Sequence, residues 1–134
     1  MRRNLRTAML FLALVGGGSA PLMAHHSVAG VFDVTKTVRL SGTVSRVEWI
    51  NPHTQVYLDV KEADGSVMTW KLESLPVAMM RKAGLSSQLI AGGGQHVLVD
   101  INPVRSGAPA VGYILSLAYD DGRHYQFARD PNEK

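Results

Sequence analysis

The sequence predicts a mainly β fold, a small OB-fold-like Greek-key barrel in the order β-β-β-α-β-β with one short helix. Apolar residues alternate in period two through five segments, as expected of half-buried strands. The first of these segments is long and irregular enough to bend around two sides of a barrel. One short segment with helix start and stop signals separates the third strand from the fourth. This order is that of the OB-fold, whereas a lipocalin-like barrel needs more strands and an immunoglobulin-type sandwich lacks the helix.

The first strand begins at Val38 and alternates in period two as far as Val44. The apolar phase then slips by three residues to Val47, which indicates a bulge at residues 45–46. A bulge increases the local twist, and Gly42 within the alternating run marks a bend or a close backbone approach. We therefore expect this one strand to serve two sides of the barrel.

Asn51-Pro52 ends the first strand, because proline has no N–H for the strand ladder and holds the preceding residue in an extended conformation. The second strand then runs back over residues 55–60. The tight corner between the two strands places His53 at a loop tip on the rim of the barrel.

The other strands follow from the same alternation and from glycine-containing turns. Ala63-Asp64-Gly65 joins the second and third strands in a hairpin, and Asp121-Gly122 leads into a short sixth strand over residues 123–127. The residues predicted to point inward are Val56, Leu58 and Val60, then Met68, Trp70 and Leu72, then Val97, Val99 and Ile101 in residues 96–104, and Tyr113, Leu115 and Leu117 in residues 111–119.

One short helix is predicted over residues 75–83. Ser74 is a candidate N-cap, and Pro76 fits the first turn, where its missing N–H costs nothing. Gly84 can end the helix in a left-handed conformation. The glycine run at residues 92–94 is expected to be a flexible loop.

Residues 1–24 have the parts of an export signal. Three arginines in the first six residues precede an apolar run over residues 8–15, and cleavage after Ala24 is favoured. The apolar run is too short to span a membrane, and no later segment approaches the required length of about 20 residues. Arg2-Arg3 also weakly resembles a twin-arginine signal, so the export route stays open between two pathways. Residues 25–134 are expected to form a single β-barrel domain in the periplasm or outside the cell.

The charge balance argues against nucleic acid as a partner. The chain has 14 Lys and Arg against 11 Asp and Glu, but three of the cationic residues lie in the predicted signal. The processed chain is therefore close to neutral, whereas nucleic-acid binding needs a clustered positive face. The absence of cysteine excludes disulfides and thiolate chemistry.

The histidines are the main chemical resource of the sequence. Cleavage after Ala24 would make His25 the N-terminus and place an α-amino group and an imidazole on one residue, a pair that can chelate a metal ion. A further nitrogen from His26 or His53 would complete a copper(II) site of the histidine-brace type. His96 and His124 lie within strands and are expected to be surface or partly buried side chains.

The sequence also carries several longer motifs, which include His25-His26-Ser27, Leu40-Ser41-Gly42-Thr43-Val44, Val47-Glu48-Trp49-Ile50-Asn51-Pro52-His53, and Trp70 with Glu73. Together these motifs resemble an exported bacterial family that is catalogued only as a domain of unknown function. The resemblance covers nearly all of residues 25–134 and implies export and a small β fold, but no reaction. The chain departs from the family pattern at Leu85, where an aromatic residue is expected, and at residues 92–95, where a Pro-Gly-Asp-type turn is expected.

The sequence favours an exported periplasmic binding module that holds copper(II) through His25, His26 and His53. The alternative is a metal-free module for protein interaction or assembly that uses the edges of the OB-like barrel. An enzyme ranks third, because the carboxylates are scattered over different strands and no pair has the context of a general acid and base. The expected partners are a metal ion or a periplasmic protein.

Overall fold

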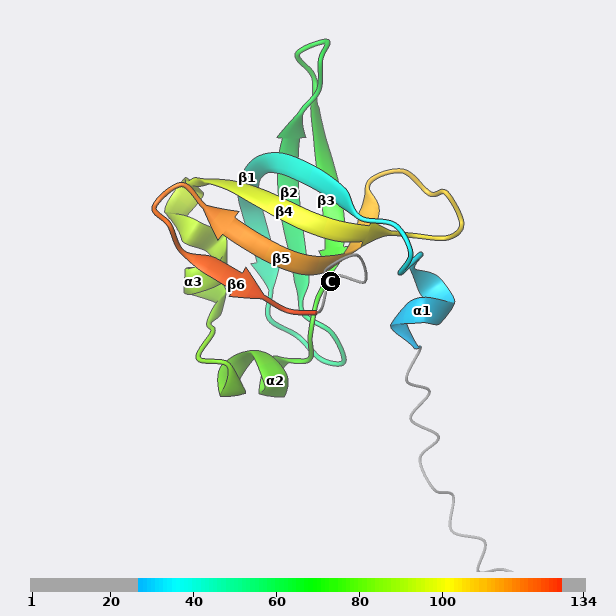
Figure 1. The fold of residues 1–134 in the computed structure, drawn as a ribbon. Helices are drawn as coiled ribbons and strands as arrows, with labels where there is room; N and C mark the ends of the chain where they lie inside the picture. Colours follow the sequence, from blue (N-terminus) through cyan, green and yellow to red (C-terminus); the bar gives the residue numbers. More distant parts are fainter. Residues whose placement is uncertain (1–26, 129–134) are drawn as a thin grey trace, which may run out of the picture.

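The computed structural model describes residues 27–128, in which five strands form a barrel and a sixth strand is added at its edge. Figure 1 shows the long first strand curving across the barrel, with the short helices at its periphery. The strands are β1 (Val38–Glu48), β2 (Gln55–Lys61), β3 (Val67–Glu73), β4 (His96–Pro103), β5 (Val111–Tyr119) and β6 (His124–Gln126).

The strand order confirms the predicted OB-like barrel. The sheet runs β3-β2-β1-β4-β5-β6, and a parallel pairing between β3 and β5 closes the first five strands into a ring. The other pairings are antiparallel. Closure removes most of the free strand edges and encloses the core, which explains how about a hundred residues can bury a continuous apolar interior.

The first strand does serve two sides of the barrel. Its first half, from Val38 to Thr43, pairs with β4, and its second half, from Thr43 to Glu48, pairs with β2. The register shifts between Val44 and Arg46, where the sequence predicts a bulge. The change of partner at Thr43 therefore coincides with the bend that the bulge permits.

The predicted inward residues of β2 and β4 lie in the core. Val56, Leu58, Val97, Val99 and Ile101 are all fully or almost fully buried within one apolar cluster, together with Leu72 of β3 and Met80 of the predicted helix.

In β5 the strict alternation breaks. Ser116 lies opposite Asp100, but the next residue of β4, Ile101, lies opposite Ile114. One residue of β5 is therefore left without a partner, and the register shifts there. Ile114 therefore joins Leu117 in the main core, whereas Tyr113 is buried outside it, with its ring 5.6 Å from that of Phe32. A bulge changes the face to which the following residues point, and this is why the predicted phase of β5 holds for only part of the strand.

Met68 was predicted to point inward with Trp70 and Leu72, and this is wrong. Leu72 is fully buried and Trp70 packs partly against the core, but Met68 is 39% exposed. Figure 1 shows the reason: the β2–β3 hairpin extends beyond the barrel, so residues near its tip have no opposite layer to pack on.

The predicted helix is present as α2 (Val77–Lys82), and Gly84 follows it with a φ of +77°. Its N-cap is Pro76 and not Ser74, whose hydroxyl instead contacts the sulfur of Met80.

The prediction of a single helix is incomplete for the described residues. Three further helical segments were missed because each is only three to five residues long and carries no helical periodicity. They are α1 (Val28–Val31), α3 (Ser87–Ala91) and the 3-10 segment η1 (Gly92–Gly94), which replaces the predicted loop. Within residues 27–128, no helix has the length and apolar character needed to cross a membrane.

Candidate functional site

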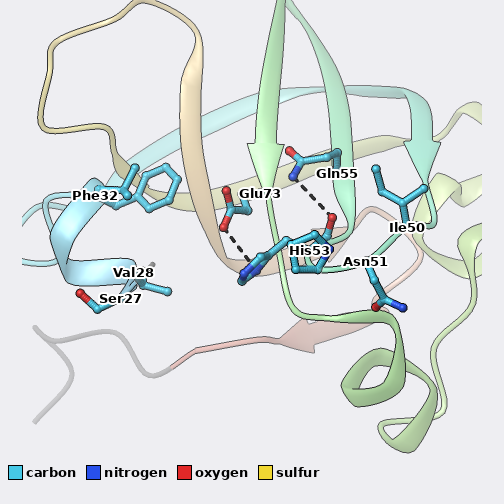
Figure 2. A pocket seen from close by; sticks show the side chains of 10 residues that line it. Ser27, Val28, Phe32, Ile50, Asn51, His53, Gln55 and Glu73 are labelled. Atoms are coloured by element: carbon cyan, nitrogen blue, oxygen red, sulfur yellow. Dashed lines mark hydrogen bonds and ion pairs between the residues drawn. The ribbon is translucent and has the colours of Figure 1, made fainter. Parts of the chain in front are cut away.

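A pocket of about 360 Å³ lies between the N-terminal turn α1 and the corner that joins β1 to β2. One wall is apolar and is formed largely by the N-terminal segment. The other wall carries the polar groups of the corner and of the ends of β2 and β3 (Figure 2). The lining residues are Ser27, Val28, Val31 and Phe32 from the first wall, and Ile50, Asn51, Pro52, His53, Gln55 and Glu73 from the second.

His53 is held in this pocket by a ring nitrogen and by the backbone of the residue that follows it. Its Nδ1 lies 3.3 Å from Oε1 of Glu73 (Figure 2). The same nitrogen lies 3.1 Å from the carbonyl oxygen of Ser74. The backbone of the next residue, Thr54, bonds to Leu75 and accepts from the amide of Ser74. The imidazole is only 20% exposed, so His53 is a fixed pocket residue and not the free loop tip that the sequence suggests.

The two partners of Nδ1 determine which tautomer the neutral ring adopts. A carbonyl oxygen and a carboxylate oxygen are both acceptors, so Nδ1 must carry the proton and donate it. In the neutral ring this leaves Nε2 with a free lone pair. A histidine that donates one ring N–H to a carbonyl or carboxylate and offers the other nitrogen is the usual form of a metal-binding histidine in proteins.

Glu73 is the site residue that sequence reasoning missed. It ends β3 and pairs in register with Gln55, two residues after His53. The hairpin turn at Gly65 fixes this register, so counting back from the turn would have placed Glu73 beside the corner. On its other side Glu73 pairs with Tyr113 of β5. Burial raises the pKa of Tyr113, and the negative charge of Glu73 raises it further.

The N-terminal wall has a local origin in the sequence. The Ser27 hydroxyl accepts a hydrogen bond from the amide of Gly30 at 3.1 Å and so caps the single turn of α1. Phe32, at the end of this turn, is 2% exposed and forms a β-bridge with Val104. The segment that begins at Ser27 is therefore fixed at the mouth of the pocket by a cap at one end and a buried aromatic ring at the other.

Of the three predicted metal ligands, the structure places only His53. His25 and His26 lie outside the described residues, and they directly precede Ser27 of the pocket wall. Between residues 27 and 128 there is no cluster of three or more His, Asp or Glu side chains that could hold a metal ion by itself.

His96 lies elsewhere, on the outer surface of the barrel. Its Nε2 is 2.7 Å from Oγ of Ser41, and its Nδ1 is 3.1 Å from Oδ1 of Asp120. The connectivity is that of a Ser-His-Asp triad, but the side chains of His96 and Asp120 are 43% and 71% exposed. Water competes for both bonds at such exposure, so this arrangement lacks the shielded acid that orients a triad histidine. His124 is likewise exposed.

Residues 13–112 match the model of a family of unknown function, DUF6152. This match covers well over half of the chain, so the protein belongs to that family. It also confirms the resemblance found in the sequence motifs. Searches among curated proteins and among solved structures gave no significant match.

Proposed function

We propose that this family member is an exported binding module that holds a copper(II) ion at the pocket, with His25, His26 and His53 as ligands. The observation that carries the proposal is the position of His53. Its imidazole sits in a pocket whose opposite wall begins at Ser27, the residue that follows His25 and His26.

Covalent geometry supports the meeting of these groups. A chain of n residues spans at most about 3.6 Å per residue, so the Cα atom of His25 lies within about 7 Å of that of Ser27. Ser27 lines the same pocket as His53. The N-terminal histidines therefore need no long arm to reach the ring of His53.

The donor set suits copper(II). Imidazole nitrogens and an amine favour copper, nickel or zinc over the hard cations, and among divalent ions of the first row copper binds such sites most tightly. Cleavage after Ala24 would supply the amine. Glu73 and the Ser74 carbonyl would act on the metal only through His53, by accepting a hydrogen bond from its Nδ1–H and so orienting the ring.

The proposal is tested by titrating copper(II) into the processed protein, whose N-terminus is first established by mass spectrometry. His53→Ala should weaken copper binding by at least the 10- to 100-fold that is typical when a metal site loses even an outer-shell partner. One added residue ahead of His25 should weaken binding comparably, because it separates the free amine from the imidazole.

The matched control is His96→Ala, which removes an exposed histidine from a different surface and should leave the affinity unchanged. Affinity no better than that of a short His-His-Ser peptide, or equal in the wild-type protein and the His53→Ala variant, would remove His53 from the site. A processed chain that retains residues before His25 would lack the amine chelate and would favour the metal-free alternative.

A metal-free role in protein interaction is the second candidate function, and one observation favours it. The β2–β3 hairpin extends beyond the barrel (Figure 1), and Val67 and Met68 on it are 63% and 39% exposed. If copper binding fails the test above, replacing both residues by serine and measuring capture of periplasmic proteins becomes the discriminating experiment, with loss of a specific partner as the expected result.

A further inference from the structure

Arg105 lies outside the pocket but contacts the backbone of the N-terminal turn. Its Nε donates to the carbonyl of Ala29 at 2.9 Å, and its backbone amide donates to the carbonyl of Val31, also at 2.9 Å. These two contacts join positions more than 70 residues apart in the chain. Figure 1 shows the β4–β5 loop, which Arg105 begins, on the same side of the barrel as α1.

The two carbonyls have a physical need for these donors. A single helical turn leaves its last carbonyl groups without partners inside the helix, and a cation near that end is favourable. In α1 the carbonyl of Val28 accepts from the amide of Phe32, so the turn itself satisfies that group. Arg105 satisfies the carbonyls of Ala29 and Val31 and thereby stabilises a four-residue helix that would be marginal alone.

The turn limits how far the N-terminal histidines can lie from the buried anchor Phe32. Seven residue steps separate His25 from Phe32, which is about 24 Å if all are extended. The four residues of α1 make three of these steps helical at about 1.5 Å each, so the largest span falls to roughly 18 Å. Melting α1 would thus enlarge the volume in which His25 and His26 move and would lower their effective concentration at His53.

We infer that Arg105 is a positioning residue, which holds the N-terminal turn α1 in place at the mouth of the His53 pocket. This inference rests on the proposed copper site for its functional consequence. The ordering of α1 by the Arg105 side chain does not depend on copper, so it can be measured in the metal-free protein.

The experiment compares Arg105→Gln, Arg105→Lys and the control Arg39→Gln in the processed full chain. Arg39 is also an exposed arginine whose Nε makes a 2.8 Å bond, but to Asp100 on the outer face of β1 and β4. Amide hydrogen exchange at Gly30 and Phe32 reports the order of α1 without metal. Copper(II) titration and the nitrogen couplings in the copper electron paramagnetic resonance spectrum report the participation of His53.

Arg105→Gln should speed exchange at both amides and weaken copper binding by about two- to tenfold, the range expected for loss of one exposed hydrogen bond. The spectrum should shift toward that of the His53→Ala variant. Arg105→Lys keeps a cationic donor, so its exchange rates and copper affinity should lie between those of Arg105→Gln and the wild-type protein. Arg39→Gln should match the wild-type protein in both measurements.

Unchanged exchange in Arg105→Gln would overturn the inference whatever copper does. Faster exchange with an unchanged affinity and spectrum, in a protein whose copper binding does depend on His53, would also overturn it. Faster exchange in a protein whose copper binding ignores His53 would instead uphold the ordering role of Arg105 and refute the proposed function.

Discussion

Replacing Gly42 by alanine tests whether the bend of β1 depends on a close approach to β2. A Cβ atom built at Gly42 would lie 2.3 Å from the carbonyl oxygen of Asp59, 3.1 Å from its carbonyl carbon and 3.2 Å from Cγ of Leu58. The nearest two atoms are backbone, so no rotamer change can relieve the contact. The strand must move instead, at the place where β1 changes partner from β4 to β2.

The size of the effect follows from this distance. Ordinary contact begins at about 3.4 Å, so β1 and β2 must separate by 3.4 minus 2.3, or roughly 1 Å, near the Thr43–Asp59 pair. A strand hydrogen bond stretched by that amount is lost. One or two lost bonds at about 0.5–1.5 kcal/mol each, plus about 1–3 kcal/mol for overpacking, give a destabilisation of about 1.5–6 kcal/mol. This is a large share of the roughly 5–15 kcal/mol that stabilises a domain of this size.

Urea denaturation of the wild-type protein and of the Gly42→Ala variant measures the difference in their free energies of unfolding directly. Gly112→Ala is the matched control, because the nearest atom to its added Cβ is Cδ1 of Ile101, the movable end of a side chain, although the carbonyl of Asn102 is 3.1 Å away. We expect Gly42→Ala to cost at least about 1 kcal/mol more than Gly112→Ala. A loss below about 1 kcal/mol for Gly42→Ala, or a larger loss for Gly112→Ala, would refute the reasoning.

Two further predictions concern stability. Trp70→Ala should destabilise the protein by about 2–4 kcal/mol, somewhat less than for a fully buried tryptophan, because the ring is only partly buried against the core; an unchanged melting temperature would make Trp70 a surface aromatic. Burial raises the pKa of Tyr119 to about 12, and its hydroxyl donates to the carbonyl of Ile90. Because the folded pKa lies above the ordinary value of 10.0, Tyr119 stabilises the protein fully below pH 10 and loses that contribution as the pH rises toward 12. Denaturation from pH 8 to 12 should show the wild-type protein losing stability relative to Tyr119→Phe over that window, and parallel curves would contradict this.

The sequence determined most of the local structure. The alternation of β2 and β4, the bulge at residues 45–46, the hairpin at Gly65 and the helix end at Gly84 all appear where the sequence predicts them. Each depends on the conformational preference or spacing of a few neighbouring residues, and such signals are present in any short window of the chain. The corner that carries His53 is likewise predicted by its neighbouring residues, Asn51 and Pro52.

Only the tertiary structure decided how the barrel closes and what surrounds His53. The parallel pairing of β3 with β5 joins Glu73 to Tyr113, and the irregularity in β5 turns Tyr113 toward Phe32. The contact of Arg105 with α1 likewise joins distant parts of the chain. Local patterns specify which residues share a face, but not which distant strand or loop will meet that face. That choice is made by the closure of the whole sheet and by the burial and hydrogen-bond requirements that closure imposes.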